Sequence, residues 1–178
     1  MDRTELASAI ATVATLRGKF RLRSGALATD YFDKYRFESD PTLLGALAQA
    51  LVPLVPSGID ALAGLELGGI PLATALSLQT GLPALFVRKR AKDYGTCRLA
   101  EGGDVTGRCL LIVEDVVTSG GQVLASCEEL RRLGGTVEHA LCVIDREAGG
   151  REALHASGVE LHALFRRRDL DGALDPIR

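Results

Sequence analysis

The sequence predicts an α/β protein with a mostly parallel, twisted sheet flanked by helices. Three observations lead to this fold class. Apolar runs of strand length alternate with segments whose apolar residues recur at helical spacing. Glycine and proline separate many of these segments. The chain has 178 residues and 47% apolar residues, which is enough for a real core, so we expect residues 1–178 to form a single domain.

The first 40 residues are expected to form a helix followed by a half-exposed strand. Apolar residues from Leu6 to Leu16 recur at helical spacing and predict a helix over 4–17. Apolar and basic residues alternate in "FRLRSG" (20–25), which predicts a strand that stops at a Ser-Gly turn. The segment "YFDKY" (31–35) is a candidate continuation of that strand.

From residue 41 onward, helices and strands are expected to alternate. Asp40 followed by Pro41 is a typical helix start. The expected helices cover 41–55, 70–78 and 123–133, the expected strands cover 59–65, 84–87, 108–113, 137–144 and 159–165, and a long polar loop covers 90–107. Ligands of such sheets bind beyond the carboxyl ends of the strands. The charged residues expected at those ends are Arg88, Glu114, Asp115 and Asp145.

Composition and local patterns argue against several classes of protein. The net charge of −2 argues against a nucleic-acid binder, so "RRR" (166–168) is interpreted as surface. The four cysteines form no CxxC pair and show no ligand spacing with the three histidines, which favours neither a zinc site nor a disulfide framework and indicates the reducing cytosol. The N-terminus does not resemble a signal peptide, and the uncharged run 67–87 is broken by glycine and proline, so no membrane span is expected.

The stretch "LLIVEDVVTSGG" (110–121) carries the strongest functional signal, and it has two interpretations. A buried strand that ends in two acids is typical of the first strand of a bacterial receiver domain. Such a domain needs about a hundred further residues, whereas only 116–178 follow Asp115 here. The next acid at a strand end, Asp145, is not followed by a lysine at a strand end. The receiver interpretation therefore fails.

The second interpretation is a cradle for a sugar phosphate. A helix that begins near Gly121 offers free backbone N–H groups, and the hydroxyls of Thr118 and Ser119 lie beside them. The two acids upstream can accept hydrogen bonds from ribose hydroxyls. Neither a Walker A motif nor GxGxxG occurs. Solvated strand-end charges, with Asp115 capping a turn, remain the plain alternative, but two acids followed by T-S-G-G favour the cradle.

Several longer segments resemble one family. "LLIVEDVVTSGGQ" resembles the signature with which type I phosphoribosyltransferases bind phosphoribosyl pyrophosphate (PRPP). "FRLRSGALATDYFDKY", "GLELGGIPLATALSLQTGLPALFVRKRAKDYGT" and "VIDREAGG" resemble the corresponding segments of orotate phosphoribosyltransferases. The similarity is best over about 20–150 and covers nearly the whole chain.

The resemblance implies a fold and a reaction. The fold is the type I phosphoribosyltransferase fold, with a helix and small hood over 1–40, a core over 41–178 and a mobile catalytic loop over 90–107. The reaction joins orotate to PRPP with Mg²⁺ and yields orotidine 5′-monophosphate and pyrophosphate. The Mg²⁺ is held mainly through PRPP rather than by protein ligands. The implied catalytic residues are Lys89, Lys92 and Asp115.

The implied substrate contacts fall into two groups. Those for PRPP are Arg88, Lys89, Lys92, Tyr94, Glu114, Asp115, Val116, Val117, Thr118, Ser119, Gly120, Gly121 and Gln122. Those for orotate are Arg23, Tyr31, Phe32, Thr118 and Arg146. An arginine can grip a carboxylate through two parallel hydrogen bonds, which suits Arg146 to this role. Its alternative is an ion pair with Asp145 or Glu147, and the alternative for "RKRAK" (88–92) is a solvated charged turn.

The chain departs from the family pattern at two positions. Gly68 stands where many relatives carry a lysine, and Tyr94 stands where the common loop has a histidine. A cation near the pyrophosphate is therefore missing at the first position. A tyrosine at the second can donate a hydrogen bond but carries no positive charge.

The resemblance also implies partners and a location. In the family the loop of one subunit reaches the site of its partner, which implies a homodimer in the cytoplasm that binds PRPP and orotate but no nucleic acid or membrane. Two other functions compete. A purine phosphoribosyltransferase would not need Arg146, since a purine has no carboxylate, and a non-catalytic regulator would carry a larger DNA-binding segment than 1–19 offers.

Overall fold

A mixed six-stranded sheet forms the centre of the molecule in the computed structural model, which describes residues 1–21, 25–91 and 98–173. Its strand order is β5-β4-β3-β6-β7-β8, and only the pairing of β5 with β4 is antiparallel. The strands are β3 (Ala61–Leu65), β4 (Ala84–Val87), β5 (Ala100–Glu101), β6 (Cys109–Val117), β7 (Thr136–Asp145) and β8 (Glu160–Arg166). The predicted mostly parallel sheet is confirmed.

Helices cover both faces of this sheet, as the alternating pattern predicts. The helices of the core are α3 (Pro41–Leu51), η1 (Val52–Leu54), α4 (Gly69–Thr80), α5 (Gly121–Arg132) and α6 (Gly150–Ala156). Successive residues of β6 face opposite sides, because strand side chains alternate. Leu111 packs with α3 and α4 on one face, and Leu110 packs with α5 on the other.

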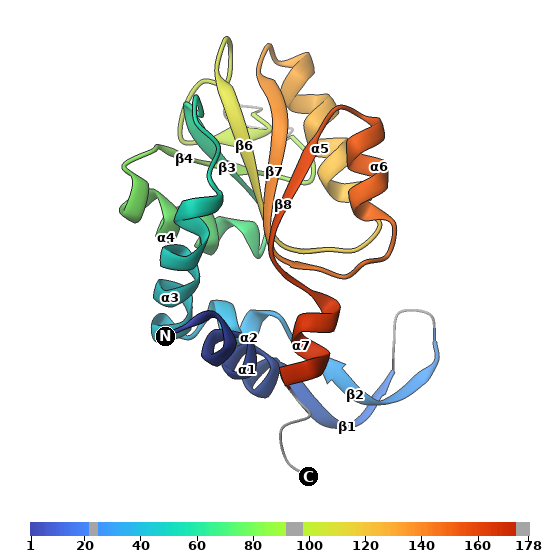
Figure 1. Cartoon of the computed structure of the whole chain (residues 1–178). Helices are drawn as coiled ribbons and strands as arrows, with labels where there is room; N and C mark the ends of the chain where they lie inside the picture. The colour runs from blue at the N-terminus through green and yellow to red at the C-terminus, as the bar shows by residue number, and fades with distance from the viewer. Residues whose placement is uncertain (22–24, 92–97, 174–178) are drawn as a thin grey trace.

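A second layer lies at the carboxyl ends of the strands (Figure 1). It consists of α1 (Arg3–Ala14), the antiparallel hairpin of β1 (Thr15–Arg21) and β2 (Leu27–Phe32), α2 (Tyr35–Glu38) and α7 (Arg167–Ala173). We call these elements the hood. Asp2 starts α1 with a capping box, and the buried side chains of Leu6 and Ile10 join the same core as α3 and α4.

Several predicted boundaries are wrong. The first helix ends at Ala14 rather than residue 17, because Thr15 and Leu16 pair with β2 instead. The segment 31–35 does not continue the first strand: a separate strand, β2, ends at Phe32 and α2 begins at Tyr35. The loop 90–107 contains β5, and the predictions omitted α6 and α7 because both are only seven residues long.

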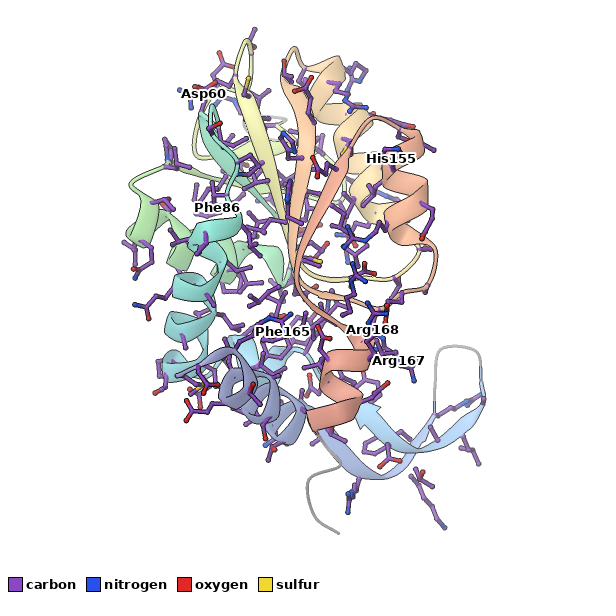
Figure 2. All side chains as sticks on the ribbon, in the orientation of Figure 1. Asp60, Phe86, His155, Phe165, Arg167 and Arg168 are labelled. Carbon is purple, nitrogen blue, oxygen red and sulfur yellow. The ribbon has the colours of Figure 1, made fainter. Side chains whose placement is uncertain are left out.

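The predicted surface position of "RRR" (166–168) agrees with the structure. Arg166, Arg167 and Arg168 are exposed where β8 leads into α7, and Figure 2 shows the last two beside the hood. Among the described residues, no helix combines the length and the apolar character that crossing a membrane requires.

Candidate functional site

The turn between β6 and α5 contains the residues of the predicted cradle. Gly120 has φ 78° and precedes the first turn of α5, where no side chain caps the helix. A left-handed backbone of this kind is accessible to glycine at little cost. The first N–H groups of α5 therefore point out of the helix without a side-chain acceptor, and such groups form an anion site.

A cleft of about 370 Å³ lies over this turn. One wall is the cradle, and the opposite wall comes from the hood. Its lining residues are Tyr31, Phe32, Asp33, Lys34, Tyr35, Glu114, Val116, Val117, Thr118, Ser119, Gly120, Gly121, Gln122 and Val123. The structure thus brings together eight consecutive residues, 116–123, around one cleft. Strand β6 continues to Val117, so Glu114 and Asp115 lie within the strand rather than after it.

Asp115 does not line the cleft, because the hood covers it. Its side chain is fully buried, and the Lys34 ammonium lies 2.6 Å from its Oδ2. The N–H of Val116 donates to Oδ1 at 2.6 Å. Both carboxylate oxygens are therefore engaged. Glu114 is also buried, with 6% exposure, but it does reach the cleft.

Glu38 of the hood completes a buried cluster of three carboxyl groups and one ammonium. Burial, and then its hydrogen bond to Asp115, raises the pKa of Glu38 to about 9. The same two causes raise the pKa of Glu114 to about 9. Burial opposes ionisation of Asp115, but hydrogen bonds from Glu38, Glu114 and Lys34 outweigh it and lower its pKa. The cluster therefore concentrates its negative charge on Asp115.

The packing around Gly68 explains one departure from the family pattern. A Cβ at Gly68 would lie 1.8 Å from Oδ2 of Asp115 and 2.7 Å from Oε1 of Glu38. No side chain fits there while the cluster is closed. Lys34 reaches the same carboxylate from the hood, so a cation is present beside Asp115 although Gly68 is not a lysine.

The basic segment after β4 is tied to the cradle through Glu66. The N–H of Lys89 donates to Oε1 of Glu66 at 2.6 Å, and the Gln122 side chain donates to the Glu66 carbonyl at 2.9 Å. Arg88 is fixed by its N–H to the Leu99 carbonyl, and its Nε lies 3.6 Å from Oε1 of Glu101. Arg88 is therefore partly engaged in an ion pair, while Lys89 is connected to the cradle residue Gln122 through Glu66.

A second cleft of about 650 Å³ adjoins the first and shares Tyr31 and Phe32 with it. Arg146 lines this second cleft together with Arg17 and Ile144. Tyr31 stacks on Phe20 with 5.5 Å between ring centroids, which fixes an aromatic wall on the hood side. The predicted base-side residues Tyr31, Phe32 and Arg146 thus meet around one cleft.

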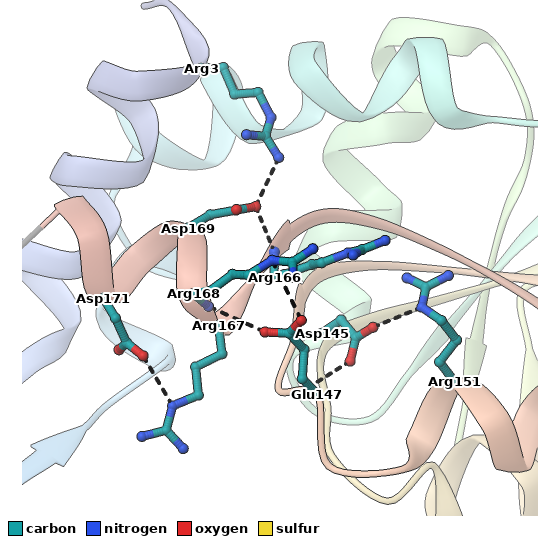
Figure 3. Close-up of polar contacts among 9 residues, drawn as sticks. All are labelled: Arg3, Asp145, Glu147, Arg151, Arg166, Arg167, Arg168, Asp169 and Asp171. Atoms are coloured by element: carbon teal, nitrogen blue, oxygen red, sulfur yellow. Dashed lines mark hydrogen bonds and ion pairs between the residues drawn. The ribbon is translucent and has the colours of Figure 1, made fainter.

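The two acids beside Arg146 have other partners (Figure 3). Asp145 pairs with Arg151 at 3.1 Å, and Glu147 lies 3.7 Å from Arg168. Glu147 has φ 53°, and its N–H donates to Asp145 Oδ1, which makes a tight turn after β7. The N–H of Arg146 donates to the Val117 carbonyl, so its backbone is fixed against the cradle strand.

Three predicted site residues, Arg23, Lys92 and Tyr94, lie outside the described residues. Sequence reasoning in turn missed Lys34, Glu38 and Glu66. Lys34 lies in the segment 31–35, which was interpreted as strand, and Glu38 lies between that segment and the helix start at Asp40, where no element was predicted. Glu66 had a signal that could have been used, since it directly follows the predicted buried strand 59–65.

Comparison with known proteins gives consistent results. The family model described as a phosphoribosyl transferase domain matches residues 28–159. The chain is 51% identical to an orotate phosphoribosyltransferase of Nocardioides sp., covering 94% of each protein, and 41% identical to one of Methanocella arvoryzae, covering 95% of this chain and 97% of the relative. The crystal structure of Mycobacterium tuberculosis orotate phosphoribosyltransferase in complex with PRPP superimposes with a TM-score of 0.83 at 30% identity, over 96% of this chain and 99% of the other.

Proposed function

The chain belongs to the phosphoribosyltransferase domain family, and we propose that it is an orotate phosphoribosyltransferase of pyrimidine biosynthesis. It transfers ribose 5-phosphate from PRPP to orotate and releases pyrophosphate. One observation carries this assignment: a phosphate cradle and a cleft lined by an arginine and aromatic residues adjoin each other and share Tyr31 and Phe32. A phosphorylated sugar and a planar carboxylate thus meet at one place.

The cradle holds the 5′-phosphate of PRPP. The N–H groups at the start of α5 and the hydroxyls of Thr118 and Ser119 donate to the phosphate oxygens. Gly120 and Gly121 leave room for the phosphate, and Gln122 links the cradle to Glu66. Val116 and Val117 contribute backbone groups along the ribose, because their side chains pack into the cores on the two faces of the sheet.

Glu114 lines the cleft and is assigned to the ribose hydroxyls, while Asp115 lies buried behind it and acts on the ribose through its charge. As the bond to pyrophosphate breaks, the ribose becomes similar to an oxocarbenium ion, which a nearby carboxylate stabilises. Asp115 carries the negative charge of the cluster, and Glu114 reaches the cleft to accept or donate a hydrogen bond. Lys34 acts as a positioning residue that holds Asp115 ionised before substrate binds.

The basic segment holds the leaving pyrophosphate. Arg88, Lys89, Lys92 and Tyr94 are assigned to this role, with Lys89 just before the loop 90–107 and Lys92 within it as the catalytic cations. The charges offset those that accumulate on the leaving group, and a closing loop excludes water. The link from Lys89 through Glu66 to Gln122 supports this placement.

The state of the acid cluster supports a Mg²⁺ ion that is held mainly through the diphosphate of PRPP and little by protein carboxylates. Mg²⁺ prefers oxygen ligands and commonly binds through one or two carboxylates plus substrate phosphates. Asp115 is already paired with Lys34, and burial raises the pKa of Glu114, so neither is an open anionic ligand. When bound, the metal supplies positive charge to the leaving pyrophosphate.

The residues of the second cleft recognise orotate by contacting the carboxylate and the ring of the base. Arg146 binds the carboxylate, the Tyr31 and Phe32 side chains contact the ring, and Thr118 and Arg23 complete the assigned contacts. The partners of Asp145 and Glu147 support this role, since both acids are paired elsewhere. A purine phosphoribosyltransferase remains the alternative, and it would give Arg146 no carboxylate to bind.

The assembly and location are part of the proposal. We assign a homodimer in which the loop 90–107 of one subunit serves the site of the other. We place the reaction in the cytosol, which is supported by the free cysteines Cys109, Cys127 and Cys142. Residues 1–40 and residues 41–178, which include α7 of the hood, act as one domain.

A turnover assay tests the assignment. Purified protein is mixed with PRPP, Mg²⁺ and orotate, and the loss of orotate absorbance is followed, with adenine, guanine and uracil in parallel pyrophosphate assays. We expect turnover with orotate and with none of the other three bases. Turnover with another base would overturn the base assignment. Arg146→Ala should weaken orotate binding more than PRPP binding. A Lys92→Ala variant with unchanged turnover would contradict the loop assignment.

A further inference from the structure

Two histidines and a glutamate meet near the amino ends of β7 and β8, far along the strands from the acid cluster. His139 lies on β7, and Glu160 and His162 lie on β8. In the parallel register His139 pairs with Glu160, and Leu141 pairs with His162. Strand alternation puts all three side chains on one face of the sheet, the face on which Leu141 and Leu164 enter the core.

The side-chain atoms already have the spacing of metal ligands. Nδ1 of His139 lies 3.2 Å from Nε2 of His162 and 3.8 Å from Oε2 of Glu160, and one ligand atom from each residue lies within 4.8 Å of the others. Two nitrogens bound to one tetrahedral Zn²⁺ at its usual bond length are about 3.3 Å apart. The histidine pair therefore needs almost no movement to chelate an ion.

A hydrogen bond between the two rings is the simpler account of the 3.2 Å contact. It requires one ring to donate and the other to accept, and it does not involve the Glu160 carboxylate, which lies 3.8 Å from Nδ1 of His139. An ion would use all three groups at once. The His139 side chain is 28% exposed and that of Glu160 is 67% exposed, so an ion can enter from solvent.

We propose that His139, Glu160 and His162 bind a divalent transition-metal ion such as Zn²⁺, with water completing its coordination. Two imidazoles and one carboxylate select zinc, nickel or copper over magnesium, which prefers oxygen ligands. The site is separate from the substrate clefts, which lie at the carboxyl ends of the strands. Sequence spacing missed it because the ligands come from two strands paired only in the fold.

Zinc titration of the full chain tests this site without any substrate. Calorimetry with ZnCl₂ should show one bound ion, and His139→Asn and His162→Asn should each weaken binding by about tenfold or more, at least the loss caused by removing an outer partner of a metal ligand. Glu160→Gln should weaken it less than either, since that side chain is the most exposed. His155→Asn is the matched control: Figure 2 shows His155 on α6, and it should bind zinc as the parent does.

Cysteine thiols must be separated from the histidine site, because Cys109 is exposed. The titrations are therefore run in a Cys97→Ser, Cys109→Ser background. Undiminished zinc binding by the double variant His139→Asn, His162→Asn would overturn the proposal, as would a parent chain that binds no zinc. An excess of Mg²⁺ should not displace the ion. Turnover of orotate should be unchanged in His162→Asn, so failure of this proposal is distinguishable from failure of the proposed reaction.

Discussion

Two buried aspartates near the carboxyl ends of neighbouring strands have different kinds of partners. Asp115 of β6 is 0% exposed and Asp145 of β7 is 2% exposed. The partners of Asp145 are Arg151 and the N–H of Glu147, both within six residues of it along the chain. The cation beside Asp115 is Lys34, which comes from the hood.

From this difference we infer that Asp145 is a structural acid and that Asp115 is the candidate functional one. Asp145 is fixed by its own turn and by α6, so its ion pair can form as soon as that segment folds. Asp115 shares a buried space with Glu38 and Glu114, and its charge depends on a hood lysine that also lines the substrate cleft. A charge held in this way is poised to interact with something that enters the cleft.

Asp115→Asn should give the largest effect on turnover, because it removes the charge that we infer to be functional. The amide keeps the shape but loses the negative charge that the proposed mechanism uses to stabilise the developing ribose cation. We expect kcat to fall about 10²–10³-fold, as for other single groups that stabilise transition-state charge. Steady-state kinetics with orotate and PRPP measures this. Asp145→Asn is the matched control. An equal loss of turnover in that variant would show that the two aspartates do not differ in their role in catalysis.

Arg151→Met should lower stability, because it removes the structural partner of Asp145. It leaves the Asp145 carboxylate buried without its cation, which costs several kcal/mol for a fully buried pair. Because the Arg151 side chain is 37% exposed, we expect a smaller loss of about 2 kcal/mol in the free energy of unfolding. Urea denaturation measures it, with turnover per folded molecule unchanged. Arg132→Met, at an exposed ion pair with Glu129, should change stability little.

Lys34→Met should lower turnover without unfolding the protein. Removing the ammonium takes away a group that lowers the pKa of Asp115, so a larger fraction of Asp115 is protonated at low pH. We expect kcat to fall by about tenfold, equivalent to about 1.4 kcal/mol, and the acidic limb of the pH–rate profile to move to higher pH. Lys19→Met, an exposed lysine of β1, is the control. A lower kcat with an unmoved acidic limb would argue against the positioning role.

Glu38→Gln should change the pH dependence of stability. The pKa of Glu38 is raised to about 9 in the folded chain, so the folded state keeps a proton that the unfolded state releases above its ordinary value near 4.5. The free energy of unfolding therefore falls as pH rises from about 5 to 9, by at most about 1.4 kcal/mol per pH unit for one proton. The amide has no proton to lose, so this slope should flatten.

Denaturation series at several pH values measure the slope. Glu128→Gln, which replaces an exposed glutamate of α5, should leave it as in the parent. A slope that Glu38→Gln does not alter would show that Glu38 does not hold this proton in the folded chain.

Much of the fold was predictable because its signals are local. The caps at Asp40 and Gly81, the apolar runs of the strands and the glycine-rich turn before α5 act over a few residues of chain. The short elements α6, α7 and β5 escaped prediction, since so few residues give no clear periodicity. The predicted helix to residue 17 failed because strand pairing with β2 outweighed the local helical pattern at Thr15 and Leu16.

The sequence by itself determined the class of fold, the cradle residues 116–122 and the residue types that suit a phosphorylated sugar and a carboxylate. Only the tertiary structure decided that Lys34 and Glu38 lie against Asp115, that Glu66 joins Lys89 to Gln122, and that His139 faces His162. The physical reason is distance along the chain. Helix caps and strand patterns depend on neighbours in sequence, whereas each of these contacts joins segments that meet only after the hood and the sheet have packed.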